Sequence, residues 1–530
     1  MSNKLKKKNV QKENYGEQIA GNMIEYVLAV VGMALCIVVP LYLKDGYHNV
    51  GSVKFSVYRW IMISGFAILF ILTIVWLFAK EDFQKAKKSD MDYCVLAFLV
   101  LSFVAAVAGG NFRECISGYD GWNMGLLAML SFGLLYFYFS RFGKYYRAVL
   151  TGLCAAAFIV FVIGILHRLL IDPIGVYKDL DDVYKNQFLS TLGQATWYSS
   201  FVCTVLPLGV GVFWCSKNVW LRVAGGVFSF AGFCTMITQN SDSAYAALAG
   251  FLAVFFWFSV VSAKRMERFA EILLLFVAST RFMYFAFRIH PNPILTLDSF
   301  SNFCIYNSKM WFISAVVILF WLAMLICAKK NFYHEKAARI IRNIIFISVG
   351  ILVVSAGIIL VMSAKGVLPE KLAAITARIP YLTWSDNWGN GRGRTWAFSL
   401  QMFADMDIFH KLFGVGPDGY APYAYGFYQE RLEQMWGNRT LTNAHNEWMN
   451  AVISYGLVGA AAYIGIFVTA IKNFAKEHLN KPVMAGFIAC VVSYMCHNFF
   501  CYQQVCCTPF LFLIVGIGMY IVTKKEKERE

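Results

Sequence analysis

The sequence predicts an all-α polytopic membrane protein with about fourteen transmembrane helices and one long extracytoplasmic loop. Hydrophobic residues make up 59% of the 530-residue chain and charged residues only 15%, and the mean hydropathy is +0.56. A soluble protein of this composition would lack the polar surface needed to cover its apolar interior. Apolar stretches of about 17–25 residues, each able to cross about 30 Å of hydrocarbon, recur along almost the whole chain.

The spans are placed by these apolar runs, which polar or charged residues separate. They are expected at 22–43, 56–79, 91–108, 123–140, 148–170, 195–215, 223–239, 244–262, 272–289, 310–328, 344–364, 446–471, 482–500 and 506–523. The chain is expected to divide into a basic tail (1–21), N-terminal helices (22–189), central helices (190–364), a loop subdomain (365–445), C-terminal helices (446–523) and a short tail (524–530).

The basic residues indicate how these spans are oriented. Of the 47 Lys and Arg, 29 fall in alternate loops, namely 1–21, 80–90, 141–147, 216–222, 263–271, 328–343, 472–481 and 524–530. The positive-inside rule makes these loops cytoplasmic. We therefore expect a multi-pass protein of the plasma (inner) membrane with both termini in the cytoplasm. The net charge of +16 then reflects topology, so the bilayer and not a nucleic acid is the expected partner.

The predicted loop 365–445 is far longer than the others, and loops of that length usually have a function or are disordered. This one contains apolar residues at helical spacing in "RTWAFSLQMFADMDIFHKLFG", followed by a Gly-Pro turn in "GVGPDGY". The residues expected to share one helical face are Trp396, Leu400, Phe403, Ile408 and Leu412. The pattern predicts amphipathic helices lying on the outer membrane surface.

No cofactor is expected from the metal-ligating residue types. The 14 cysteines lie mostly in apolar spans, and no CxxC pair or Cys/His ligand spacing occurs. Asp405 and Asp407 in "ADMD" resemble a metal-chelating DxD pattern, but so short a pattern arises easily by chance. The acidic "DLDD" at 179–182 is more readily a solvated loop than a divalent-cation site.

One histidine stands out in "TNAHNEWMNAVISYGLVG", which runs from Thr442 to Gly459. Asn443 or Thr442 is expected to cap the helix of the twelfth span, so His445 would lie in its first turn. The positive end of the helix dipole and partial burial both disfavour the imidazolium, so His445 should be neutral near pH 7 and able to accept a proton. The plainer alternative is a polar residue at the membrane interface.

Arginines on the same predicted side suit the binding of phosphate oxygens by paired, charge-assisted hydrogen bonds. Arg392 and Arg394 lie in the glycine-rich "GNGRGRTW". Arg281 and Arg288, in "STRFMYFAFRIH", lie in or beside the outer half of an apolar span, where a charge is costly unless it is paired or hydrated. There are plainer alternatives. Arg392 and Arg394 can simply lie on a solvated surface, and Arg281 and Arg288 can extend their side chains to the membrane interface.

The segment "GRGRTWAFSLQMFADMDIFHKLFGVGPDGY", followed by "NAHNEWMNAVISYGLVGAAAYIG", resembles the signature of the O-antigen ligase and O-antigen polymerase superfamily. "STLGQATWYSSFVCTVLPLG" at 190–209 is similar to another segment of these proteins. The resemblance covers roughly 190–520 and is strongest at 391–460. It implies a lipid-sugar-dependent glycosyltransferase of the GT-C type. Such enzymes transfer a glycan from undecaprenyl diphosphate to an acceptor hydroxyl outside the plasma membrane, in cell-surface polysaccharide biosynthesis.

The resemblance also implies roles for individual residues. His445 corresponds to the motif histidine and Arg392 to the loop arginine, and these two are the expected catalytic residues. The expected substrate-binding residues are Arg394, Arg281, Arg288, Asn443, Asn446, Asp242 and Trp396. The sequence departs from the pattern in "TQNSDSAYAALAG", where Asp242 replaces an arginine of the family. A carboxylate cannot bind the donor diphosphate unaided, so either Arg281, Arg394 or another cation takes over this role, or the donor is held differently.

Together these features suggest a metal-independent, inverting transfer in which His445 accepts the acceptor proton and arginines stabilise the departing diphosphate. The acceptor is expected to be a glycan, a lipid or a protein, and other polysaccharide-assembly proteins are possible partners. Ligase, polymerase and protein O-glycosyltransferase all remain open. The strongest alternative of another class is a lipid-linked oligosaccharide flippase or other polytopic transporter, although no internal repeat is evident. A non-catalytic receptor or scaffold is a third.

Overall fold

The computed structural model is almost entirely helical, and it describes residues 2–80, 88–178, 180–478 and 480–527. Ten of the described helices are long and apolar enough to cross a membrane: α1 (Ser2–Leu41), α2 (Val50–Ala79), α3 (Asp90–Ala108), α6 (Tyr146–Arg168), α8 (Ala195–Cys215), α9 (Val219–Met236), α11 (Ala263–Ile289), α13 (Lys309–Lys330), α14 (Glu335–Ala364) and α19 (Glu447–Glu477). Four shorter helices are also apolar: α5 (Leu126–Phe142), α10 (Ser243–Ser259), α20 (Met484–His497) and α21 (Thr508–Lys527). The predicted all-α polytopic fold is confirmed, and each predicted span overlaps one of these helices.

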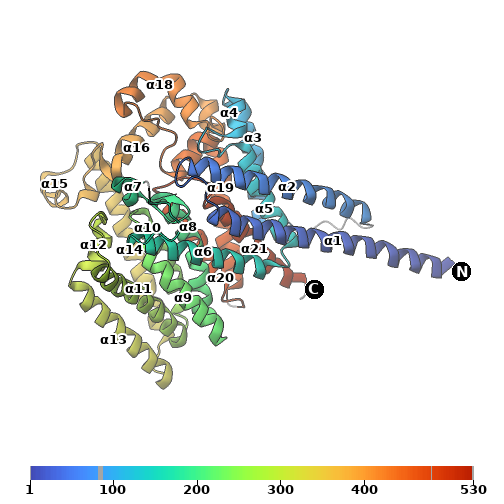
Figure 1. Ribbon diagram of the computed structural model, residues 1–530, viewed down its shortest axis with the longest axis horizontal. Coiled ribbons are helices and arrows are strands. Elements are labelled where there is room, and N and C mark those ends of the chain that lie inside the picture. The colour runs from blue at the N-terminus through green and yellow to red at the C-terminus, as the bar shows by residue number, and fades with distance from the viewer. Residues whose placement is uncertain (1, 81–87, 179, 479, 528–530) are drawn as a thin grey trace.

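The remaining elements lie in the loops predicted to be long. They are α4 (Phe112–Ser117), α7 (Asp182–Gln187), α12 (Ser299–Tyr306), α15 (Glu370–Thr376), the 3₁₀ helix η1 (Pro380–Leu382), α16 (Trp388–Asp405), α17 (Ile408–Phe413), α18 (Tyr420–Trp436) and the antiparallel strands β1 (Phe188–Leu189) and β2 (Gly193–Gln194). Figure 1 shows α15, α16 and α18 on the side of the molecule away from both termini.

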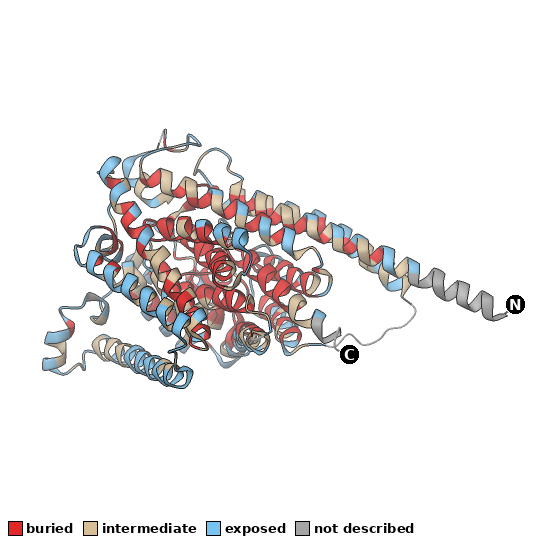
Figure 2. Cartoon of the chain, turned by 90° about the horizontal axis from the view of Figure 1, so that it is seen from below, coloured by how far each residue is buried: buried red, intermediate tan, exposed pale blue. Residues whose placement is uncertain are grey.

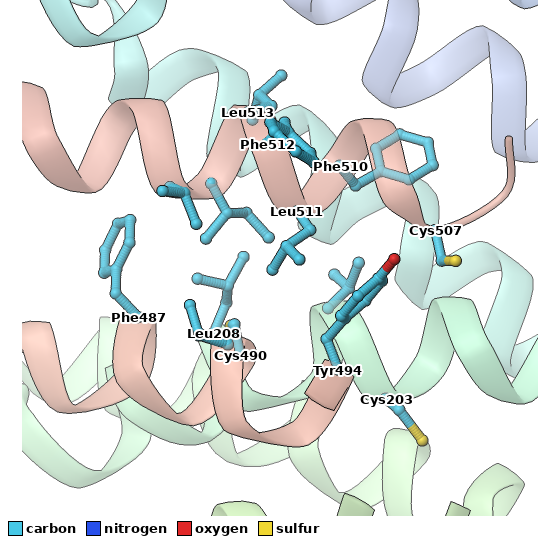
Figure 3. Close-up of a cluster of buried hydrophobic side chains, with 14 of the residues drawn as sticks. Cys203, Leu208, Phe487, Cys490, Tyr494, Cys507, Phe510, Leu511, Phe512 and Leu513 are labelled. Carbon is cyan, nitrogen blue, oxygen red and sulfur yellow. The ribbon is translucent and has the colours of Figure 1, made fainter. Parts of the chain in front are cut away.

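The core is built around α8, whose residues are mostly buried and which packs against α9 and α20. Figure 2 shows the buried residues concentrated in the middle of the helical body. Close to α8, side chains of α20 such as Phe487, Cys490 and Tyr494 face those of α21, including Leu511 (Figure 3). Lipid tails are as apolar as these side chains, so close packing rather than escape from water holds the helices together.

Two helices contribute little to this core. None of the residues of α14 is buried, and α13 buries only Met310 and Ser314. Apolar side chains therefore cover α14 on all sides, as is typical of a helix surrounded by lipid. Its C-terminal end nevertheless meets the following loop, because the backbone N–H of Trp384 donates to Ser363 Oγ at 3.0 Å.

Buried cations stabilise the ends of the first helices. Lys54 Nζ donates to the carbonyl oxygens of Val39, Pro40 and Tyr42 at 2.8, 2.9 and 2.5 Å and so caps the C-terminal end of α1. Arg168, at the end of α6, is 1% exposed and donates to four backbone carbonyls, those of Thr238, Gln239, Lys185 and Asn186. Such buried charges are tolerated because each donor finds an acceptor.

Residues 365–446, here called the loop segment, are helical as predicted and have a small core of their own. That core includes Phe398, Met402, Val415, Tyr420 and Leu432. The helical face predicted from the spacing was wrong in two positions, because Leu400 is 58% exposed and Ile408 is 71% exposed. The buried stripe of α16 is displaced to Thr395, Phe398, Ser399 and Met402, and the helix ends at Asp405, so Ile408 begins a separate helix.

The loop segment is attached to α19 where that helix is broken. Gly456 has a φ of 67°, which interrupts the helix and frees carbonyls in the preceding turn. The N–H of Val415 donates to Ile453 O at 3.1 Å, and the N–H of Gly416 donates to Ser454 O at 2.9 Å. The "GVG" turn thus satisfies the backbone groups that the break exposes, and it fixes the loop segment to the N-terminal half of α19.

Replacing Gly456 by alanine should therefore detach the loop segment. An added Cβ would lie 2.2 Å from the carbonyl oxygen of Leu412, and the left-handed backbone disfavours any Cβ. We expect Gly456→Ala to lower the free energy of unfolding by about 1–3 kcal/mol or more, the usual cost of such backbone strain. Thermal unfolding of the detergent-purified protein should show a lower Tm.

The matched control is Gly357→Ala, in α14, where an added Cβ meets no atom within 4 Å. This substitution should leave the Tm unchanged or raise it slightly, because alanine is the better helix former. Equal Tm values for the two variants would show that the helix break at Gly456 accommodates a Cβ without strain.

Candidate active site

The first component of the site is Arg392, at the start of the regular part of α16. The three residues before it, 389–391, have left-handed φ values of 58°, 60° and 89° and turn the chain sharply. Arg392 Nη1 donates to Gly389 O at 2.8 Å, and its Nε and Nη2 donate to Phe500 O at 3.0 and 2.8 Å. A guanidinium has more N–H groups than these three bonds use, so donors remain for a ligand.

The second component is the loop between α20 and α21, residues 498–507, which supplies Phe500 and Tyr502. The ring of Phe500 also stacks on Trp396, with centroids 6.1 Å apart and planes 19° apart. The spans predicted at 482–500 and 506–523 left almost no loop here. The helices end earlier and begin later than the apolar run indicates, and the exposed backbone of this loop binds the arginine.

The third component is His445, which lies before α19 and not in its first turn as predicted. Asn446 is the N-cap, with its Oδ1 accepting from Met449 N at 3.0 Å. His445 itself has a φ of 50°, and its N–H donates to Asn443 Oδ1 at 2.9 Å. This left-handed turn directs the imidazole ring toward Tyr502, with centroids 5.3 Å apart and planes at 77°.

His445 is neutral at physiological pH. Burial, and then the positive charge of Arg392, lower the pKa of His445 from 6.5 to about 4. The direction of this shift agrees with the one expected from the sequence, although the arginine rather than the helix dipole assists burial. Within the described part of the chain, neither ring nitrogen of His445 is hydrogen-bonded, so a nitrogen lone pair is available to a substrate proton.

Asp242 lies close enough to Arg392 for their charges to interact. Burial, and then the charge of Asp298, raise the pKa of Asp242 above its usual range, and Arg392 opposes that shift. The hydroxyl of Tyr381, in η1, donates to Asp242 Oδ2 at 3.5 Å. Asp242 therefore modulates the charge around Arg392 and supplies no cation of its own.

Two residues that support the site were missed by the sequence analysis. The carboxylate of Glu447, two residues after His445, accepts from the hydroxyls of Tyr463 and Tyr494 and from the amide of Asn498, and the Glu447 N–H donates to Asn498 O at 2.9 Å. These bonds join the start of α19 to the 498–507 loop. The only available signal was a second His-Asn pair, in "CHNFF", that repeats the one in "AHNEW".

The other residue that was missed is His497, which is 1% exposed at the end of α20. Its Nε2 lies 2.8 Å from Ser199 Oγ and 3.0 Å from Ser243 Oγ, and its Nδ1 lies 3.1 Å from Ser200 Oγ. These contacts tie α8 and α10 to the end of α20, one residue before the 498–507 loop. The histidine therefore holds the loop that binds Arg392.

Several expected substrate-binding residues lie around the site and have structural contacts. Arg394 Nη1 donates to Met435 O at 2.5 Å, and its guanidinium lies 5.6 Å from the Trp436 ring centroid, so it joins α16 to α18. Asn443 and Asn446 shape the turn that carries His445. Trp396 is 8% exposed and packs against Phe500, so it supports the backbone that Arg392 binds.

The structure does not bring Arg281 or Arg288 to this site. Arg281 Nη2 donates to the carbonyls of Cys304 and Ile305, at 2.5 and 3.1 Å, and its guanidinium lies 4.9 Å from the Trp311 ring centroid. Arg288 lies over Tyr284 at 4.8 Å. Among the contacts of the described residues, none joins either arginine to His445 or Arg392. The burial of Arg281 is explained by its hydrogen bonds to these nearby backbone carbonyls.

The acidic patterns also have local roles. Asp407 caps α17 by accepting from the N–H groups of Phe409 and His410, and Asp405 accepts from the Tyr428 hydroxyl at 3.1 Å. Of "DLDD", residue 179 lies outside the described residues, and Asp182 pairs with Lys185 at 3.0 Å. Over the described ranges, no group of three or more His, Cys, Asp or Glu side chains is arranged to hold a metal ion.

Fold and site together define a polytopic, all-helical membrane protein in which a neutral histidine feels the charge of a half-buried arginine. Residues 294–464, less than half of the chain, match the family model described as O-antigen ligase. The chain therefore carries an O-antigen ligase domain, and this glycosyltransferase-like family of membrane glycan ligases and polymerases supports an enzyme. No curated protein matches the chain.

The influence of Arg392 on His445 can be measured directly. Arg392→Gln removes a positive charge that disfavours the imidazolium, so it should raise the pKa of His445 above about 4. The value should stay below 6.5, because burial is the larger cause and remains. The measurement is an NMR titration of histidine ring nitrogens in the labelled protein, with His445→Gln used to assign the signal.

Arg392→Lys is the control, since it keeps the positive charge and should keep the pKa of His445 low. An unchanged His445 pKa in Arg392→Gln, or titration near 6.5 in the unaltered protein, would contradict this account of the site.

Proposed function

We propose that this protein transfers a glycan from an undecaprenyl-diphosphate donor to an acceptor hydroxyl at the outer face of the plasma membrane. The observation that carries the proposal is the imidazole of His445, kept neutral by burial and by the charge of the half-buried Arg392 guanidinium. A base and a fixed cation close enough for their charges to interact match the two requirements of such a transfer. One group must accept a proton, and another must stabilise an anionic leaving group.

The reaction can be written from these groups. A nitrogen of His445 takes the proton from the acceptor hydroxyl as its oxygen attacks the anomeric carbon. The bond from that carbon to the diphosphate oxygen breaks, and its electron pair remains on the diphosphate. Arg392 donates its free N–H groups to the phosphate oxygens as negative charge grows there. Attack opposite the leaving group inverts the anomeric configuration, and the arginine supplies the positive charge without a metal.

Sidedness is supported by two observations. The 29 basic residues in alternate loops indicate cytoplasmic termini by the positive-inside rule. In Figure 1 the helices of the loop segment lie away from both termini, so a cytoplasmic location of the termini puts the site outside. Polyprenyl-linked donors present their diphosphate at the membrane surface, at the level where a site between helix ends and a loop segment would meet it.

His445→Ala should reduce glycan transfer by about 10²-fold or more, because general-base assistance is typically worth 10²–10⁴-fold in rate. Membrane abundance should stay normal, since the ring makes no hydrogen bond to the described residues. The measurement is transfer rate per unit of protein in membranes, together with the lipid-linked intermediate that accumulates in cells. That intermediate identifies the donor and separates ligation from polymerisation.

His410→Ala is the matched control, because this histidine lies in the same loop segment but its ring contacts the nearby exposed Asp407 and the rings of Phe409 and Tyr423. It should transfer glycan at the normal rate. Unchanged transfer by His445→Ala would instead favour a flippase or a scaffold, for which the imidazole has no chemical task.

A further inference from the structure

A narrow polar cleft lies close to His445, because two of its lining residues contact that histidine. The lining includes Trp122, Asp418, Asn443, Asn450, Tyr502 and Gln503. Asn443 Oδ1 accepts from the His445 backbone N–H, and the centroids of the Tyr502 ring and the imidazole are 5.3 Å apart. Tyr502 is therefore shared by the cleft and the imidazole.

The cleft has an open carboxylate oxygen. Asp418 Oδ2 accepts from the backbone N–H groups of Tyr119 and Met124, at 3.0 and 2.7 Å. Its Oδ1 has no hydrogen bond to the described residues, and Asp418 is one of the residues that line the cleft. Burial raises the pKa of Asp418 by more than the two N–H bonds lower it, so this carboxyl group is less well solvated than that of a surface aspartate. An oxygen in this state gains from a hydroxyl donor.

The other walls suit the same kind of ligand. Asn443, Asn450 and Gln503 contribute side-chain amides, which donate and accept hydrogen bonds. Trp122 and Tyr502 contribute aromatic surface, with their ring centroids 4.6 Å apart. The interior has a volume of about 10 Å³, which is no more than one water-sized group needs. The cleft can therefore enclose a single hydroxyl but not a sugar ring.

The site and the cleft carry charges of opposite sign. Arg392 lies close enough to His445 for its positive charge to lower the pKa of the imidazole, and Asp418 contributes a carboxylate to the cleft. The described residues that line the cleft include no lysine or arginine. An anionic diphosphate is attracted by Arg392 and repelled by Asp418, whereas a neutral sugar can enter the cleft without that repulsion.

We propose that this cleft is the acceptor subsite and that it selects an uncharged sugar, whose hydroxyl is held by Asp418 and presented to His445. That the cleft binds the acceptor rests on the proposed function, but the preference for neutral over anionic sugars follows from the cleft alone. A uronic acid would place a second carboxylate against Asp418, and like charges disfavour one another at such short range.

Binding is tested on the full-length, detergent-purified protein with paired methyl glycosides: glucoside with glucuronoside, and galactoside with galacturonoside. Ligand-observed NMR at pH 7.5 gives the dissociation constants. At least one neutral member should bind about 10-fold or more tightly than its uronate, which corresponds to about 1.4 kcal/mol. Equal or tighter binding of the uronates, or no binding by any member of the pairs, would overturn the proposal.

Asp418→Asn provides the variant. Asparagine keeps one oxygen for the two backbone N–H groups and tolerates the φ of 55° at this position, but it replaces the open carboxylate oxygen by an amide. The neutral-to-uronate ratio should fall to about 3-fold or less, and the acceptor KM should rise about 10-fold while the donor KM stays the same. Asp405→Asn, on the exposed end of α16, is the control and should change neither.

The outcomes separate the two proposals. If His445→Ala abolishes transfer but Asp418→Asn leaves both the binding ratio and the acceptor KM unchanged, the transferase stands and the subsite is wrong. If the binding ratio depends on Asp418 while His445→Ala transfers normally, the cleft binds neutral sugars but is not an acceptor subsite.

Discussion

The rest of the structure depends on the backbone hydrogen bonds between the "GVG" turn and the break in α19. A helix interrupted within a membrane exposes carbonyl groups that lipid cannot satisfy. Val415 and Gly416 satisfy those of Ile453 and Ser454. This attachment holds the loop segment, which carries both Arg392 and His445, against the N-terminal half of α19.

Desolvation determines the chemistry of the site. Burial shifts the pKa values of His445, Arg392, Asp242 and Asp418 more than any individual charge does. It keeps the imidazole neutral, so the base is ready without a carboxylate partner. The guanidinium, by contrast, stays protonated even when buried. Its own bonds to Phe500 and Gly389 leave donors directed elsewhere, so the site holds a fixed positive charge before any substrate arrives.

The site is assembled from parts that lie inside and outside the region of family similarity. Arg392, His445 and Asp418 fall within residues 294–464, whereas Asp242, the 498–507 loop and Trp122 do not. Residues inside the matched region are thus held in place by residues that lie outside it. Here the surroundings supply the carbonyl that orients the arginine, the ring beside the histidine and the aromatic wall of the cleft.

The sequence by itself predicted the all-α polytopic fold, because membrane spans are local apolar runs and each of these falls on an apolar helix. It also led to His445 and Arg392 as candidate residues, because the motif that carries them is contiguous. Tertiary structure alone decided what surrounds them. Arg281 donates to nearby carbonyls, Asp242 interacts with Arg392 through its charge, and Phe500 O accepts from the guanidinium. Whether a polar side chain serves a substrate or a neighbouring backbone group depends on which distant segment lies beside it, and no local pattern records that.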